Sequence, residues 1–193
     1  AQEDFEANQA VREAEQQTGP TVTSDAPAIA EIKPVQEALQ VDARVPFDAA
    51  SVDGSIRLAG SRIDDLSLKK HYLTVDKKQE VRLFRPENSE FGYFATWYWA
   101  DGSKLVAGRN SNWTQVGEGQ LTPGNPLILR LESEGLIIDR EISVDEDYLF
   151  TFTDTVTNNS GESREVRAIG SIERHGDYKE FLETTDPGSS SKG

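Results

Sequence analysis

The sequence predicts an all-β protein, an antiparallel β-sandwich that follows an acidic segment without stable structure. Beyond residue 45, short stretches of alternating apolar and polar residues are separated by turns rich in Asn, Asp, Gly and Pro. Alternation with a period of two is typical of half-buried strands, and many short strands at regular spacing are typical of antiparallel sandwiches. No helical periodicity is evident after residue 50.

Residues 1–45 are predicted to form a disordered linker, and residues 46–193 to form the folded domain. The linker is acidic and rich in Ala, Gln and Pro, and Phe5 is its only aromatic residue. Such a composition buries too little apolar surface to offset the conformational entropy that is lost on folding. Residues 6–17 favour a helix by propensity but lack a wide apolar stripe, so we expect at most a transient helix there.

The first strands of the domain are predicted at residues 55–72. Ile56 and Leu58 alternate with polar neighbours, Gly60 interrupts the run, and Ile63 resumes it with the parity shifted by one. A shift of one residue in a pattern of period two indicates two strand segments joined at a tight turn or a β-bulge.

A central strand is predicted at residues 93–99, because apolar residues occupy both of its faces. Trp97 and Trp99 share one face of this strand, and Trp113 follows in a short strand beside a Gly-rich loop. Aromatic faces in a β-sandwich belong to the core, or they stack on sugar rings and receive apolar peptides. These three tryptophans are therefore candidates for a ligand or peptide cleft, with core packing as the alternative.

Further strands are predicted in the second half of the chain, with turns of Asn, Asp, Glu, Gly and Ser between them. On one of these strands Leu136, Ile138, Arg140 and Ile142 share a face. The remaining strands are expected at residues 127–132, 148–156 and 166–172.

Composition excludes several classes of function. The formal net charge of −14 argues against nucleic acid partners, which are usually bound through clusters of Lys and Arg. The chain has no cysteine, so disulfides, thiolate zinc sites and cysteine nucleophiles are excluded. It also has no methionine, which indicates a processed chain or a fragment, and no apolar run long enough to span a membrane. A membrane anchor of the parent protein would lie outside this chain.

No catalytic, cofactor or metal site is predicted. His71 and His175 are the only histidines, and the sequence contains no HxH, HxxxH or GxSxG pattern around them. Surface histidines near strand ends are the preferred interpretation. Asp64 and Asp65, like the acidic residues 145–147, lack the spacing of a calcium loop, so we expect them to lie on solvated turns and strand faces.

The segment GSIRLAGSRIDDLSLKKHY, at residues 54–72, resembles the start of the large periplasmic domain of YidC membrane protein insertases, particularly of the alphaproteobacterial form. Further matching pieces follow in the order of that family: VRLF at 81–84 with the aromatic strand after it, LTPGNPL at 121–127, ISVDEDYLFTFTD at 142–154 with VTNNSG at 156–161, and SIERHG at 171–176. The acidic lead-in also fits this family.

The resemblance implies a twisted β-sandwich of the galactose-mutarotase-like type on the periplasmic side of the bacterial inner membrane. It implies a non-catalytic domain that assists insertion and folding of inner-membrane proteins, attached to an insertase core and transmembrane segments outside this chain. The implied partners are Sec translocon components and nascent membrane proteins. Because the family's domain is longer, we expect this chain to hold its front part and an incomplete sandwich.

The alternative function is a periplasmic carbohydrate-binding or mutarotase-like domain. It rests on an analogy of fold alone, which is a weak basis for function. Mutarotase-like catalysis uses histidine and carboxylate groups in the cleft of the sandwich, and this chain offers only His71 and His175, both near predicted strand ends.

Overall fold

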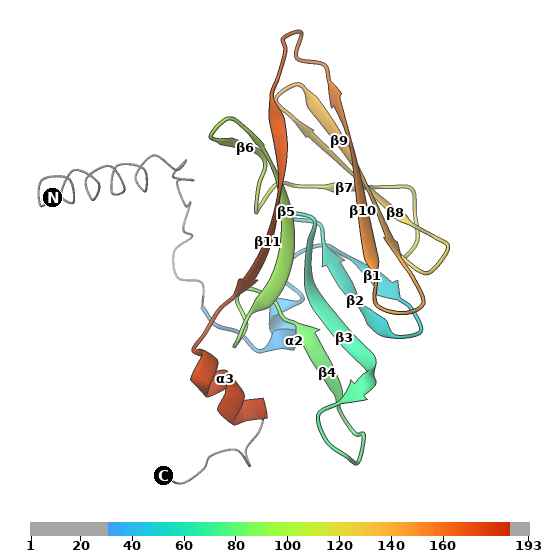
Figure 1. Cartoon of the computed structure of the whole chain (residues 1–193), viewed down its shortest axis with the longest axis vertical. Helices are drawn as coiled ribbons and strands as arrows, with labels where there is room; N and C mark the ends of the chain where they lie inside the picture. The colour runs from blue at the N-terminus through green and yellow to red at the C-terminus, as the bar shows by residue number, and fades with distance from the viewer. Residues whose placement is uncertain (1–30, 186–193) are drawn as a thin grey trace, which may run out of the picture.

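The structure, a computed structural model, describes residues 31–185 (Figure 1). It confirms the all-β antiparallel sandwich. A short helix, α2 (Val35–Ala38), precedes the strands, and a second helix, α3 (Tyr178–Thr185), follows them. The strands are β1 (Arg44–Asp48), β2 (Val52–Arg57), β3 (Arg62–Tyr72), β4 (Glu80–Phe84), β5 (Tyr93–Asp101), β6 (Lys104–Ala107), β7 (Thr114–Val116), β8 (Leu127–Ser133), β9 (Leu136–Val144), β10 (Phe150–Asn158) and β11 (Val166–Arg174).

Two antiparallel sheets make up the sandwich (Figure 1). The seven-stranded sheet has the order β1-β2-β3-β5-β11, with β4 paired to β3 and β6 paired to β5. The four-stranded sheet has the order β10-β9-β8-β7. Strand β5 lies between β3 and β11, so the aromatic strand is central, as its two apolar faces predict.

The core lies between the two sheets, where apolar side chains from both inner faces meet. Phe47 and Ile56 from the larger sheet, and Leu129 and Ile142 from the smaller one, are almost completely buried. Phe47 also contacts Phe150 edge to face, with 5.1 Å between the ring centroids. Along β1, β8 and β9 buried residues alternate with more exposed ones, which is the pattern expected of two packed sheets.

The turn between β2 and β3 explains the shift in parity of the opening strands. Gly60 and Ser61 both have positive φ angles, of 80° and 47°. Further along the hairpin, Ser55 pairs with Asp65 and Ile56 pairs with Ile63, so Asp64 is the extra residue of a bulge. The expected turn and bulge are both present. A Cβ atom on Gly60 would lie 2.2 Å from the carbonyl oxygen of Arg109, so glycine permits the close approach of these two loops.

Residues 31–43, which precede β1, contact the sandwich. From the sequence, all residues up to 45 were predicted to belong to the linker. The N–H of Lys33 donates to the carbonyl of Asn88 at 2.8 Å, and Ala38 is only 3% exposed. Pro34 is the N-cap of the helix that carries Ala38. A helix of four residues is too short to give a periodic signal. Residues 1–30 of the expected linker lie outside the described residues.

Helix α3 is a second difference, because the sequence showed no helical periodicity after residue 50. The carboxylate of Asp177 accepts the N–H of Lys179 at 2.7 Å, as a helix N-cap does. Phe181 packs against Phe91, with the ring centroids 5.6 Å apart. Eight residues held by tertiary contact carry too weak a pattern for detection by sequence. Between residues 31 and 185, no helix is long and apolar enough to cross a membrane.

Candidate functional site

A cavity of about 430 Å³ lies between the segment around α2, the strands β1 to β3 and two loops that follow β4 and β6. Its lining is dominated by charge. Four arginines face three carboxylates and a histidine, and the carboxylates belong to Asp42, Asp64 and Glu87. The arginines are Arg44, Arg57, Arg62 and Arg109, and the histidine is His175. A cavity with this lining stands out in a chain of net charge −14.

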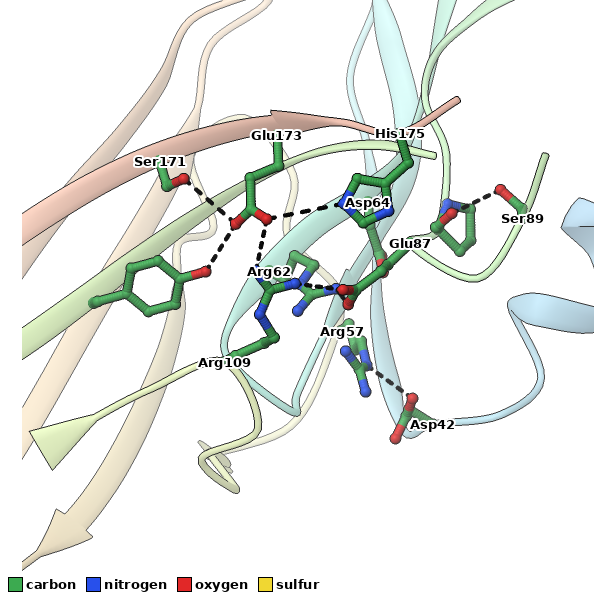
Figure 2. Close-up of polar contacts among 12 residues, drawn as sticks. Asp42, Arg57, Arg62, Asp64, Glu87, Ser89, Arg109, Ser171, Glu173 and His175 are labelled. Carbon is green, nitrogen blue, oxygen red and sulfur yellow. Dashed lines mark hydrogen bonds and ion pairs between the residues drawn. The ribbon is translucent and has the colours of Figure 1, made fainter. Parts of the chain in front are cut away.

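Two ion pairs form the wall on the side of β1 and β2. Arg44 donates to both carboxylate oxygens of Asp64, with N···O distances of 2.7 and 3.2 Å. Arg57 donates through Nε to Asp42 at 2.8 Å (Figure 2). Both arginines also lie on neighbouring antiparallel strands, so the sheet register brings them together at one end of the cavity.

Asp64 and Asp65 are buried, so the expectation that they lie on a solvated face is wrong. The bulge between β2 and β3 turns both carboxylates inward, where Asp64 is 1% exposed and Asp65 is 9% exposed. Asp65 accepts a hydrogen bond from Ser55 at 2.7 Å and pairs with Arg82. Buried carboxylates need such partners because desolvation otherwise disfavours their charged form.

Glu87 and Arg109 belong to the opposite wall, and Arg109 pairs with both Glu87 and Glu173 (Figure 2). Glu87 accepts Nη1 of Arg62 at 2.7 Å and also binds Nη1 of Arg109. Arg109 donates through Nη2 to Glu173 at 2.6 Å, and Nε2 of His175 lies 4.0 Å from the same carboxylate. The result is a continuous chain of charges from β3 to the end of β11.

The neighbouring arginines change the acidity of this wall. Burial alone would raise the pKa of Glu87, but the hydrogen bond from Arg62 and the charges of Arg62 and Arg109 outweigh it and lower that pKa. Burial likewise opposes the charged form of Arg109, yet Glu173 and Glu87 raise its pKa. Both groups are therefore held in their charged forms at neutral pH.

Arg62 is the least satisfied member of the cluster. Its side chain is 0% exposed and its guanidinium carbon lies 4.4 Å from the centroid of the Phe94 ring. Nη1 binds Glu87, but Nε and Nη2 have no hydrogen-bond partner in residues 31–185. A buried N–H group without a partner costs free energy, so native proteins rarely leave one empty without reason.

The tryptophans proposed from the sequence come together elsewhere, between the two sheets. Trp97 stacks on Phe152 with 3.8 Å between ring centroids, and Nε1 of Trp99 donates to Asp154 at 2.6 Å. Trp113 is 3% exposed and its ring lies 4.7 Å from the guanidinium carbon of Arg140. None of the three lines the cavity described above. A ligand or peptide cleft at Trp97, Trp99 and Trp113 stays a prediction.

The hydrogen-bond donors of the cavity determine which ligands it can bind. Arginine guanidinium groups bind carboxylates and other oxyanions through charge-assisted hydrogen bonds. Across the described part of the chain, no group of three or more His, Asp or Glu side chains is arranged to hold a metal ion. The arginine side chains in the lining favour binding of an anion.

Comparison with known proteins places the chain in a family. Residues 44–190 match the family model described as the YidC periplasmic domain. The chain belongs to this family. The match covers every strand of the sandwich, from β1 to β11. The YidC resemblance predicted from the sequence is thereby confirmed.

Individual relatives carry the name Membrane protein insertase YidC. The chain is 40% identical to the one from Cereibacter sphaeroides over 171 residues, which cover 84% of this chain and 27% of the relative. It is 39% identical to the one from Maricaulis maris over 183 residues, covering 91% of this chain and 31% of the relative. The chain thus spans less than a third of the length of these two YidC proteins.

Sequence reasoning missed the arginine cluster. Arg62 and Glu87 are 25 residues apart, and Arg109 and Glu173 are 64 apart, so no local spacing connects them. The one local signal was the interrupted alternation at Gly60, which marks the turn before Arg62. Identifying the cluster required the strand order of the YidC periplasmic domain.

Proposed function

We propose that this chain is the periplasmic domain of a membrane protein insertase and that it assists insertion and folding of inner-membrane proteins. The observation that carries the proposal is the family match over residues 44–190, together with relatives about 40% identical that are named as insertases. The insertase core would lie in the remaining two thirds of the protein, and its transmembrane segments would anchor this domain to the periplasmic face of the inner membrane.

The domain acts by binding and not by catalysis. The ionisable groups that gather in the cavity neutralise one another, as Arg57 does with Asp42 and Arg62 with Glu87. A general acid or base needs a pKa near the working pH, whereas Glu87 has a lowered pKa. This charge pairing supports a recognition surface.

The partners would be nascent membrane proteins and components of the Sec translocon, and the edges of the two sheets offer a surface for them. β10 and β11 each pair with a neighbour on one side only, and every residue of both strands is at least partly exposed. Ile172 on β11 is 68% exposed and Leu149 beside β10 is 64% exposed. Unpaired strand edges with exposed apolar side chains accept extended segments of other chains.

Site-specific photocrosslinking in the full-length insertase, in its own membrane, tests this function. A photoreactive amino acid at Ile172 is expected to crosslink to newly made membrane proteins or to translocon components. The control is the same amino acid at Val75, which is 100% exposed in the loop between β3 and β4. Equal yields at both positions, or none at Ile172, would contradict the proposal.

The carbohydrate-binding alternative is not favoured. The relatives described above are named as insertases, and Trp97, Trp99 and Trp113 are engaged with Phe152, Asp154 and the buried Arg140. No second function is proposed.

A further inference from the structure

Arg62 presents an empty edge that is built for a carboxylate. An arginine offers two parallel N–H groups along its Nε–Nη2 edge, and their spacing matches the two oxygens of a carboxylate. In Arg62 these are the two nitrogens that have no partner among residues 31–185, although the side chain is completely buried. Its Nη1 is already bound to Glu87.

The same protein shows what this edge binds when it is occupied. Arg140 donates through Nε and Nη2 to the two oxygens of Asp154, at 2.8 and 2.7 Å. Arg130 donates through the same two atoms to Asp139, at 2.7 and 2.8 Å. A carboxylate is therefore the group that the free edge of Arg62 is shaped to receive.

The cavity next to Arg62 has room and hydrogen-bond donors for such a ligand. Its volume of about 430 Å³ falls in the range of small-molecule sites. Each of its four arginines already has a carboxylate partner, so an added carboxylate is favoured by the Nε and Nη2 donors of Arg62, which have no partner in residues 31–185. Ile32 and Val41, which line the α2 side, are 63% and 55% exposed, and they offer an apolar surface beside the arginines.

We propose that this cavity binds a carboxylate attached to an apolar group of about amino-acid size, and that Arg62 holds the carboxylate through Nε and Nη2. Because Arg62 is completely buried, a neighbouring side chain has to move for the ligand to enter. We expect Glu87 to be that side chain, because it lines the cavity, is 24% exposed and is shared between Arg62 and Arg109. Glu87 can stay on Arg109 while the ligand takes Arg62. This inference does not depend on the insertase role.

The test is a titration of the ¹⁵N-labelled chain with N-acetyl-leucine, followed by the NMR signal of the Arg62 Nε–H group. N-acetyl-leucinamide, which has the same apolar part and no carboxylate, is the matched control ligand. We expect N-acetyl-leucine to shift the Arg62 signal with a dissociation constant on the order of 1 mM, and the amide to leave it unchanged. Inorganic phosphate, a third ligand, is expected to bind more weakly.

Variants of the cavity sharpen the test, with binding followed by backbone amide signals of residues 86–88 and 109–110. Arg62→Lys removes the bidentate Nε–Nη2 edge but keeps the positive charge, and we expect at least a tenfold weaker affinity for N-acetyl-leucine. Glu87→Gln removes the negative charge that repels the ligand carboxylate beside Arg62, and we expect roughly fivefold tighter binding. Arg130→Lys changes the same residue type at an exposed pair away from the cavity and should leave the affinity unchanged.

Four results would overturn the proposal. Equal shifts with N-acetyl-leucine and its amide would mean that the apolar part alone binds. No shift with either ligand up to about 50 times the expected dissociation constant would leave water as the occupant of the Arg62 edge. Tighter binding of phosphate would remove the preference for a carboxylate, and unchanged affinity in Glu87→Gln would remove the role of Glu87. The wild-type titrations need no variant, so the test stands even if Arg62→Lys fails to fold.

Discussion

In the part of the chain that the structure describes, two arginines are completely buried, one in each sheet, and their surroundings differ. Arg140 on β9 uses all three guanidinium nitrogens: Nε and Nη2 bind Asp154, and Nη1 lies 3.4 Å from the carbonyl of Trp97. Arg62 on β3 uses only Nη1, toward Glu87. Both lie against an aromatic ring, Trp113 for Arg140 and Phe94 for Arg62.

The difference indicates a structural role for Arg140 and a binding role for Arg62. Asp154 lies on β10 and also accepts Nε1 of Trp99 on β5, so Arg140 and its partners connect the two sheets. Arg62 borders a cavity. Its carboxylate partner Glu87 lies on a loop and also forms an ion pair with Arg109. A saturated buried arginine stabilises the sandwich, whereas a half-satisfied one beside a cavity keeps donors available for a ligand.

The largest effect is expected from Asp154→Asn, which leaves Arg140 charged and buried without its carboxylate. Breaking a buried ion pair from one side typically costs about 3–5 kcal/mol, so we expect a loss of this size in the free energy of unfolding, measured with urea. The matched control is Asp139→Asn, which breaks a bidentate ion pair of the same geometry, with Arg130, at the surface. Its unfolding midpoint should stay unchanged. Similar losses in the two variants would mean that burial does not set the difference.

A smaller effect is expected from Arg62→Met. The substitution removes the ion pair with Glu87, but Glu87 keeps Arg109, and two unpartnered N–H groups disappear from the interior. We expect a loss of about 1–2 kcal/mol in urea unfolding, against about 3–5 kcal/mol for Arg140→Met. An equal loss at both arginines would show that Arg62 is as structural as Arg140.

The smallest effect is expected from Glu87→Gln, and it depends on pH. Because the folded-state pKa of Glu87 lies below its ordinary value of 4.5, the charged form stabilises the fold above that pH and loses this contribution as the pH falls through the folded-state pKa. We expect a loss of about 0.5–1 kcal/mol at pH 7, which shrinks below about pH 4.5. Urea unfolding at pH 7, 5 and 3.5 measures it, and a constant difference over this range would contradict the pKa shift.

The two arginines also differ in how far the sequence anticipated them. On β9 the alternation already places Arg140 among Leu136, Ile138 and Ile142, on the face that is buried. A charge within an apolar face indicates a buried ion pair, although not its partner. Arg62 follows a turn and precedes a bulge, where the parity of the strand changes, so no pattern assigned it to either face.

The errors of the sequence interpretation have the same origin. Asp64 and Asp65 were expected on a solvated face because adjacent acidic residues usually lie there. The bulge turned both inward and gave them Arg44 and Arg82 as partners. Likewise, α2 and α3 are short helices stabilised by contact with the sandwich, which a local pattern does not contain.

The sequence by itself determined most of the strands and turns, although not β1 or β6, and the YidC family, because alternation, turn residues and motif order are local properties of the chain. Only the tertiary structure decided which charges are buried and which of them meet. Arg62 and Glu87 meet across 25 residues and Arg109 and Glu173 across 64, and their contact depends on the order of strands in the larger sheet. Burial then sets the free energy of each pair, since desolvation and partner geometry depend on the packed interior.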